Sequence, residues 1–301
     1  MSQFYEKLTT TIPELEIRLD EPMSRHTTFR IGGPADYFVC PDREQIAEVF
    51  RIAHTYKIPV TVIGNGSNLL VGDKGIRGLV VEIGSAMNQI TVENNHIIAG
   101  AGALLSKVAA KAASEELGGM EFAAGIPGSI GGAVTMNAGA YGGEMKDILS
   151  KVTVLTDDGE IQTLDVSEMD LSYRHSCVPE NHYIVLEAEI VLERKPEAEI
   201  REQMEELRKK RVEKQPLEYP SAGSTFKRPE GYFAGKLIMD AGLRGYMVGD
   251  AQVSEKHCGF VINRKNASAA QVCQLMQDVQ DKVEKQFGVR LEPEVKMLGE
   301  F

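Results

Sequence analysis

Val60-Thr61-Val62-Ile63-Gly64-Asn65-Gly66-Ser67-Asn68 is the stretch of sequence that decides the fold. Its first half is a short, β-branched apolar run, which predicts a strand, and its second half is a glycine-asparagine loop. Upstream, Asp42 can cap a helix with an apolar face at Ile46, Val49, Phe50 and Ala53. Downstream, strands are predicted at 78–83 and 97–99, with a helix at 104–117. Strands and helices therefore alternate in the first half of the chain.

Glycine is unevenly distributed along the chain. Of the 29 glycines, 19 lie between Gly32 and Gly143, and nine of these lie between Gly118 and Gly143. Glycine loses the most conformational freedom on folding, so this crowding indicates tight turns or backbone that approaches a ligand closely. A loop-rich α/β domain without a ligand is the alternative.

Two glycine-rich loops are candidates for a phosphate site. They are residues 64–68 and Ala124-Gly125-Ile126-Pro127-Gly128-Ser129-Ile130-Gly131-Gly132. Each can present consecutive backbone N–H groups in a concave arrangement, which binds pyrophosphate without a cation. Neither loop contains lysine or arginine. Taken singly each is as well explained as a structural turn, but together they favour a large phosphorylated ligand.

The two common nucleotide-binding signatures do not match. The nearest approach to a P-loop, Gly231 to Lys236, has too few intervening residues and is followed by Leu237. Gly64-Asn65-Gly66 and Gly100-Ala101-Gly102 both lack the third glycine of the dinucleotide fingerprint. A Rossmann or P-loop enzyme is therefore disfavoured.

Composition and charge exclude several further classes. The 301 residues carry a formal charge of −11, and acidic residues outnumber basic ones on both sides of residue 150, which disfavours nucleic acid as a partner. No apolar run approaches the length of about 18 residues that a membrane helix needs, and Met1–Lys7 lacks the order of a signal peptide. We therefore expect a cytoplasmic protein without a membrane partner.

The four cysteines suggest neither a disulfide framework nor a metal site. They are widely spaced, without a Cys-x-x-Cys pair. His257, beside Cys258, is interpreted as a structural histidine, and no metal is expected.

The second half of the chain predicts a hairpin and then a second domain. The hairpin comprises 152–155 and 161–164, and a further strand follows at 183–192. A densely charged, exposed helix is predicted from 196 to about 214, where it would join two domains. Helices at 232–241 and 267–287 and strands at 259–262 and 289–298 then form an α+β unit. The predicted segments are an N-terminal segment 1–24, a first domain 25–195 and a second domain 196–301.

Three polar residues in the second half are candidates for chemistry, although none supports a function alone. Ser224, in Ser224-Thr225-Phe226-Lys227, matches the Ser-x-x-Lys pattern of serine acylating enzymes, but their Ser-Asp-Asn and Lys-Thr-Gly elements are missing. Arg174 could hold a carboxylate through two hydrogen bonds, or could pair with a surface acid. Glu294 follows Pro293 near a strand end, where a carboxylate is more often solvated than catalytic.

The joint order of these motifs resembles that of the UDP-N-acetylenolpyruvoylglucosamine reductases (MurB), flavoenzymes of bacterial wall-precursor synthesis. The runs that carry the resemblance extend over nearly the whole chain: Thr28-Phe29-Arg30-Ile31-Gly32-Gly33-Pro34-Ala35, residues 64–68, residues 125–129, Asn137-Ala138-Gly139-Ala140-Tyr141-Gly142, Tyr173-Arg174-His175-Ser176, Ser221–Lys227 and Leu291-Glu292-Pro293-Glu294-Val295. Only 50 positions separate Arg174 from Ser224, which resembles the shorter subclass that lacks a tyrosine-bearing loop.

The resemblance implies an α+β fold, with an FAD-binding domain of the vanillyl-alcohol-oxidase (PCMH) type and a C-terminal substrate-binding domain. It implies non-covalent FAD, NADPH as electron donor, and a UDP-sugar substrate whose enolpyruvyl ether is reduced to give UDP-N-acetylmuramate. It implies catalytic roles for Arg174, Ser224 and Glu294 and substrate contacts for Tyr141, Arg174 and Lys227. The cofactor-binding residues would be Gly64, Asn65, Gly66, Ser67, Asn68, Gly125, Ile126, Pro127, Gly128, Ser129, Asn137, Ala138 and Gly139.

The chemistry of that reaction explains the three catalytic residue types. Hydride addition to a double bond conjugated with a carboxylate builds negative charge, which an arginine at position 174 would stabilise. Ser224 would then protonate carbon, and Glu294 would polarise the intermediate or supply a proton route. Another FAD-dependent oxidoreductase of the same fold, a non-catalytic flavin- or nucleotide-binding regulator, and a serine acylating enzyme are the alternatives.

Overall fold

The computed structural model describes residues 2–301, and the chain forms two compact units, each assembled from separate stretches of sequence. Unit 1 contains the residues up to Arg18, Phe38–Asn65 and Gly78–Lys210. Unit 2 contains Leu19–Tyr37, Gly66–Arg77 and Arg211–Phe301. These units are divisions of the folded backbone by compactness. The functional segments 1–24, 25–195 and 196–301 are contiguous in sequence and stay a prediction.

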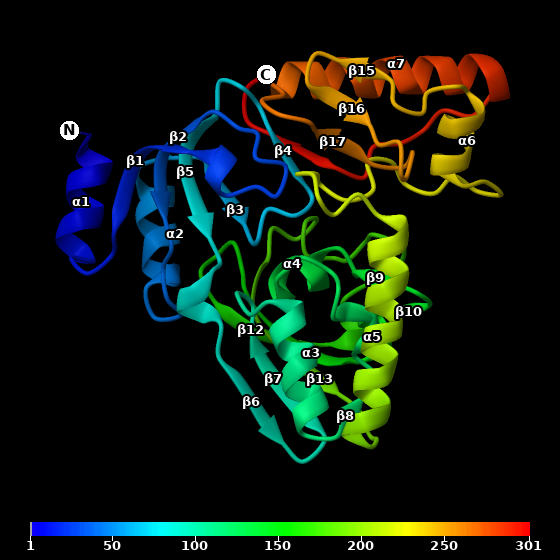
Figure 1. Ribbon diagram of the computed structural model, residues 1–301. Coiled ribbons are helices and arrows are strands. Elements are labelled where there is room, and N and C mark those ends of the chain that lie inside the picture. The colour runs from blue at the N-terminus through cyan, green and yellow to red at the C-terminus, as the bar shows by residue number, and fades with distance from the viewer. Residues whose placement is uncertain (1) are drawn as a thin grey trace. The chain divides into compact units, whose positions relative to one another are not determined.

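Unit 1 is built around a five-stranded antiparallel sheet (Figure 1). Its strand order is β12 (Ile161–Asp165), β11 (Leu149–Leu155), β13 (Ile184–Val191), β7 (His96–Gly100) and β6 (Ile90–Glu93). The hairpin and the strand predicted from alternating β-branched residues are confirmed, because β11 pairs with both β12 and β13. Helix α4 (Ile130–Thr135) packs against β13 and β7, and buries Ile130, Ala133 and Val134.

Two further helices of unit 1, α2 (Ile46–Thr55) and α3 (Leu105–Ser114), are those predicted from the sequence. Helix α2 buries Ile46, Val49, Ile52 and Ala53, and Asp42 accepts hydrogen bonds from backbone N–H groups before its first turn. Helix α3 confirms the helix predicted at 104–117. Strand β3 (Val60–Ile63) runs parallel to β5 (Ile76–Glu82). Helix α1 (Gln3–Thr11) packs on α2.

Further short strands complete the fold. Strands β1 (Ile17–Pro22), β2 (Pro34–Val39), β5 and β3 lie in that order in one sheet, and β1, β2 and β5 each have residues in both units. In unit 1, β8 (Leu117–Gly118) pairs with β14 (Glu193–Arg194), and β9 (Gly139–Ala140) pairs with β10 (Gly143–Glu144). Helix α5 (Glu197–Lys214) is the predicted charged helix, and its one buried residue is Ile200.

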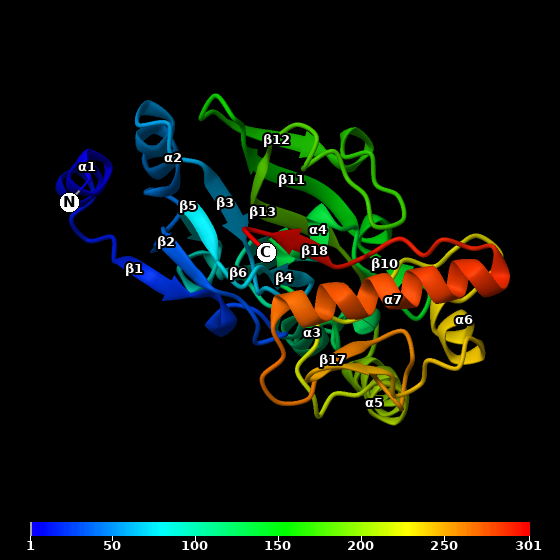
Figure 2. The ribbon, with the colours of Figure 1, turned by 90° about the horizontal axis from the view of Figure 1, so that it is seen from above.

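Unit 2 contains a small antiparallel sheet with one long helix packed on it (Figure 2). Strands β15 (Met247–Val248), β16 (Ala251–Val253) and β17 (Val261–Asn263) form the sheet. Helices α6 (Ala234–Asp240) and α7 (Ala269–Phe287) confirm the two predicted helices, and α7 packs on β15 and β16. The apolar core beneath α7 includes Val272, Leu275, Val279 and Val283, all fully buried.

The strand predicted at 289–298 is wrong over most of its length. Only Lys296–Leu298 forms a strand, β18, which pairs in parallel with β4 (Leu69–Val71). Pro293 lacks a backbone N–H and makes an isolated bridge with Phe226, so this part of the chain cannot continue a ladder.

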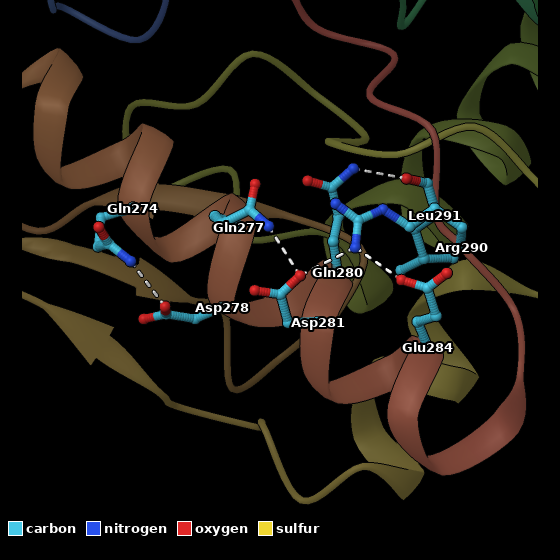
Figure 3. Close-up of polar contacts among 8 residues, drawn as sticks. All are labelled: Gln274, Gln277, Asp278, Gln280, Asp281, Glu284, Arg290 and Leu291. Atoms are coloured by element: carbon cyan, nitrogen blue, oxygen red, sulfur yellow. Dashed lines mark hydrogen bonds and ion pairs between the residues drawn. The ribbon is translucent and has the colours of Figure 1, made fainter.

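Polar contacts with α7 hold the irregular segment that precedes Glu294 (Figure 3). The Nε2 atom of Gln280 donates to the carbonyl oxygen of Leu291 at 2.8 Å. The guanidinium of Arg290 lies 2.9 Å from an oxygen of Asp281 and 2.7 Å from one of Glu284. The segment therefore has a defined path without being a strand. Among residues 2–301, no helix has the length and apolarity needed to cross a bilayer.

Candidate active site

The two glycine-rich loops predicted to bind phosphate meet within unit 1. The Nδ2 atom of Asn65 donates to the carbonyl oxygen of Pro127 at 2.6 Å. Gly64 lies against Ser129, because a Cβ atom built on Gly64 would come 2.5 Å from the Ser129 Oγ atom. Residues more than 60 positions apart in the sequence are thus in contact, and a side chain at position 64 would have to displace the Ser129 hydroxyl.

Main-chain hydrogen bonds fix the second loop to the end of β7. Leu105 N–H donates to the Gly128 carbonyl, and Ile130 N–H donates to the Ala103 carbonyl. Gly131 N–H donates to the Ala101 carbonyl at 2.8 Å. The loop from Gly125 to Ser129 is therefore a rigid part of unit 1, and its end leads directly into α4.

Ser129 supplies an observation that bears on cofactor binding. Its side chain is only 3% exposed, yet its Oγ atom has no hydrogen-bond partner among residues 2–301. A buried hydroxyl without a partner costs free energy, so its retention beside a glycine-lined loop fits a polar group supplied by a ligand. The residues of this loop therefore fit the FAD that the sequence motifs imply.

The Asn137-Ala138-Gly139 run leads into a tight hairpin, β9–β10. The two turn residues, Tyr141 and Gly142, both have positive φ angles, of 54° and 91°. Such a two-residue turn joins antiparallel strands with the correct twist. Tyr141 is exposed at the tip of this hairpin.

Arg174 lies in a second tight turn of unit 1. Ser172 and His175 exchange two main-chain hydrogen bonds, of 3.2 and 3.1 Å, and Arg174 between them has a φ angle of 57°. The Arg174 guanidinium carbon lies 5.2 Å from the centre of the Tyr173 ring. The side chain of Asn137 is hydrogen-bonded to the carbonyl of Ser172, so the two motifs lie together.

In unit 2, the remaining part of the first glycine loop packs on main chain. A Cβ atom on Gly66 would lie 1.9 Å from the His26 carbonyl oxygen, and Gly66 has a φ angle of 62°. Glycine at position 66 is thus required by the protein's own backbone, a reason that the sequence did not reveal. The Nδ2 atom of Asn68 donates to the Glu294 carbonyl at 3.1 Å, and Lys296 N–H donates to the Asn68 carbonyl. Asn68 therefore holds the segment that contains Glu294.

Thr225 brings the Ser224 and Glu294 motifs together inside unit 2. Its carbonyl accepts a hydrogen bond from Glu294 N–H at 2.8 Å. Its N–H donates to the Gly259 carbonyl at 2.8 Å, and its Oγ1 atom accepts from Val261 N–H at 2.9 Å. Ser224 and Glu294 are thus carried by neighbouring main-chain segments, although 70 positions separate them in the sequence.

Lys227 is held in the same arrangement. Its N–H donates to the Glu292 carbonyl at 2.8 Å, and its Nζ atom lies 3.1 Å from the Oε2 atom of Glu292. The lysine is half-buried and carries a positive charge at the end of the Ser224 motif.

His257 is a structural residue, as the sequence suggested. Its Nδ1 atom accepts a hydrogen bond from Gly259 N–H at 3.1 Å, and its ring packs edge-on against Phe260 at 5.0 Å. Burial lowers the pKa of His257 from its ordinary value of 6.5, because the charged form is poorly solvated there.

Two groups that organise the site were not among the sequence candidates. They are Thr225, whose carbonyl accepts from Glu294 N–H, and Glu144, whose Oε2 atom accepts from Asn137 Nδ2 at 2.7 Å. Thr225 acts through its main chain on a segment about 70 positions away, and Glu144 acts across the β9–β10 hairpin, so no helical or strand periodicity indicated either residue.

Comparison with known proteins gives consistent matches along the chain. Residues 215–298 match the family described as UDP-N-acetylenolpyruvoylglucosamine reductase, C-terminal domain, and residues 34–165 match an FAD binding domain. A UDP-N-acetylenolpyruvoylglucosamine reductase of Agathobacter rectalis is 65% identical over 310 residues, with 99% of both chains covered. One of Caldanaerobacter subterraneus subsp. tengcongensis is 53% identical over 296 residues, with 98% of both covered. The crystal structure of MurB from Thermus caldophilus superposes with a TM-score of 0.81 and 35% identity, covering 94% of this chain and 98% of that one.

Proposed function

The chain belongs to the UDP-N-acetylenolpyruvoylglucosamine reductase family, and from this premise we propose that Arg174, Ser224 and Glu294 carry out its reaction. The α+β fold class and the FAD-binding domain expected from the sequence are confirmed. The enzyme is an NADPH-dependent flavoprotein that reduces the enolpyruvyl ether of UDP-N-acetylglucosamine-enolpyruvate in peptidoglycan precursor synthesis. We infer that it works in the cytoplasm, where NADPH and UDP-sugars are present.

Arg174 would act on the carboxylate of the substrate. The guanidinium is always charged and can donate two parallel hydrogen bonds to a carboxylate. Negative charge spreads into that carboxylate as the double bond is reduced, so the attraction is stronger in the transition state than in the ground state. The tight turn from Ser172 to His175 fixes the main chain from which this side chain extends.

Ser224 would donate the proton that completes the reduction, and Glu294 would polarise the intermediate or renew that proton. A serine hydroxyl is a weak acid in water, but carbon that carries developing negative charge is a strong base. Thr225 fixes the main chain beside both residues, which limits the positions that their side chains can reach. Lys227 and Tyr141 are proposed to contact the substrate, Lys227 through its positive charge.

We propose that the cofactor is held mainly by the two glycine-rich loops, residues 64–68 and 125–129, and by Ala138 and Gly139. Bound there, FAD would supply the hydride-transfer chemistry that links NADPH to the substrate. The Ser129 hydroxyl would donate to or accept from a polar group of FAD, which satisfies an otherwise orphaned atom.

The observation that carries the proposal is the hydrogen bonding of Thr225, which joins the Ser224 and Glu294 segments. The test is Ser224→Ala, with Ser221→Ala as the matched control, in stopped-flow absorbance measurements of flavin. We expect flavin reduction by NADPH to stay within about twofold, and reoxidation by the enolpyruvyl substrate to slow about 10²–10⁴-fold. Equal slowing of both half-reactions, or of neither, would show that Ser224 is not the proton donor.

A further test concerns the cofactor. Ser129→Ala removes a buried hydroxyl that has no partner among residues 2–301, so the apoprotein should unfold at the same temperature or a higher one. The affinity for FAD should fall about tenfold, measured by fluorescence titration, because one hydrogen bond is worth about 1.4 kcal/mol. Unchanged FAD affinity would mean that the hydroxyl does not contact the cofactor.

A further inference from the structure

Asn137 is buried, and its side-chain amide makes three hydrogen bonds to other residues of unit 1. Its side chain is 1% exposed and its φ angle is 40°. Its Nδ2 atom donates to the Glu144 Oε2 atom at 2.7 Å and to the Ser172 carbonyl at 3.0 Å, and its Oδ1 atom accepts from Lys146 N–H at 2.9 Å. Both amide protons are therefore used within the protein, so the amide nitrogen has no proton left for a ligand.

The bond to the Ser172 carbonyl acts on the turn that carries Arg174. In this turn a non-glycine residue, Arg174, has left-handed backbone geometry, with a φ angle of 57°. That conformation costs about 1–2 kcal/mol and persists only where surrounding contacts hold it. The reciprocal main-chain bonds between Ser172 and His175 close the turn, and Asn137 fixes its first residue from outside.

A second hydrogen bond anchors the other end of the turn to the same region. The Ser176 hydroxyl donates to the carbonyl of Thr135, the last residue of α4, at 2.8 Å. Asn137 follows α4 by two residues, so both anchors come from the end of one helix. Helix α4 therefore connects two parts of the candidate site. The loop Gly125–Ser129 leads into its first turn, and the Arg174 turn is hydrogen-bonded at its other end.

We propose that Asn137 is a positioning residue for Arg174, rather than a direct ligand of FAD. This inference rests on the proposed function, in which Arg174 stabilises negative charge on the substrate. Asn137 holds the strained turn so that the Arg174 guanidinium starts from a fixed main chain. A displacement of about 1 Å in such a group can cost about 10²-fold in rate.

The test uses Asn137→Gly in the holoenzyme. Glycine adopts the left-handed backbone without strain, so this variant removes the side-chain hydrogen bonds without forcing a new backbone conformation on the folded state. The matched control is Asn94→Gly, because Asn94 is exposed and also has a positive φ angle, of 60°. We expect Asn137→Gly to retain FAD in a 1:1 ratio and to be reduced by NADPH at the normal rate. Its reoxidation by the enolpyruvyl substrate should slow about 10–100-fold, and the KM for that substrate should rise.

A double-mutant cycle with Arg174→Ala shows whether Asn137 acts through Arg174. On the Arg174→Ala background, Asn137→Gly should change reoxidation by less than about threefold, because the group that it positions is gone. If the double variant is slowed by the product of the two single-variant fold-changes, the residues act independently and the inference is overturned. Loss of FAD or slowed reduction by NADPH in Asn137→Gly would also overturn it. If Arg174→Ala alone reoxidises normally, the proposed function of Arg174 fails instead. If Asn137→Gly does not fold, Asn137→Ser enters the same cycle with the same criteria.

Discussion

Asp73 caps helix α7 from a distant part of the sequence, which gives a quantitative prediction for unit 2. Its Oδ1 atom accepts from Ala269 N–H at 2.7 Å, and its Oδ2 atom accepts from Ala270 N–H at 2.9 Å. Ser268 Oγ accepts from the next N–H, that of Gln271, at 3.1 Å. The first three N–H groups of α7 are therefore satisfied by two side chains, and Asp73 accounts for two of them.

The magnitude follows from these contacts. Loss of a capping side chain costs about 0.5–2 kcal/mol, and removal of a negative charge from a helix N-terminus adds about 0.3–1 kcal/mol. Asp73 is exposed, so water replaces part of what is lost, at least at Ala270. We expect Asp73→Ala to lower the free energy of unfolding by about 1–2 kcal/mol. Asp73→Asn keeps one acceptor and should cost about half as much.

The assay combines thermal unfolding with local hydrogen exchange. Unfolding entropy is about 2.1 cal/mol/K per residue, so 1 kcal/mol shifts the Tm of a 301-residue chain by about 1.6 °C, and Asp73→Ala should melt about 2–3 °C lower. Amide exchange at Ala269 and Ala270 should become faster, while exchange in the middle of α7 should change less. Asp158→Ala removes an exposed carboxylate of the β11–β12 turn and serves as the charge control. Equal Tm values and equal exchange at Ala269 in wild type and Asp73→Ala would refute this account of the cap.

Three further predictions concern other contacts. Gly66→Ala should lower the Tm of the apoprotein by more than Gly142→Ala does, because its Cβ would meet the His26 carbonyl, whereas nothing lies within 4 Å of a Cβ at Gly142; equal melting of the two variants would contradict the close contact. Burial lowers the pKa of His257 in the folded state, so below pH 6.5 the unfolded chain binds a proton more readily than the folded chain does. The free energy of unfolding is therefore highest above pH 6.5 and decreases as the pH falls from there toward the folded pKa. His257→Gln should therefore lose less stability than wild type between pH 7.5 and 5, measured by urea unfolding, and a parallel loss in both would refute that sign. Arg290→Ala should change the free energy of unfolding by less than about 1 kcal/mol, since its two ion pairs are exposed, and a loss above 2 kcal/mol would show that they are much stronger.

Local patterns predicted five of the seven α-helices within residues 2–301 and the longer strands of the five-stranded sheet. Helix α2 appears where Asp42 and the apolar spacing of 46–53 placed it, and the hairpin β11–β12 turns at residues 157–159. These elements depend on capping, periodicity and turn residues that lie within one or two turns of each other. The short strands β4, β8, β9, β10, β14, β15 and β16 were missed, because two or three residues are too few for a period to be visible. The longer strands β1, β2 and β6 and the helices α1 and α4 were also not predicted.

The candidate site was predicted as a set of motifs, and the structure supplied their connections. The sequence indicated Asn137 as a cofactor residue, whereas the structure shows its amide bound to the Arg174 turn. It indicated Gly66 as a point of ligand approach, whereas the nearest group to its missing side chain is the His26 carbonyl. In both cases the residue type was informative, but the partner that required it was not visible.

The sequence alone determined the α+β elements, the glycine-rich loops without basic residues, and the identity of the family through the order of its motifs. Only the tertiary structure decided that Asp73 caps a helix 196 positions away, that Thr225 joins the Ser224 and Glu294 segments, and that the orphaned Ser129 hydroxyl lies beside Gly64. The physical reason is the range of the interactions. Backbone preferences and periodic burial act between near neighbours, whereas these hydrogen bonds and close contacts exist only after the chain has packed.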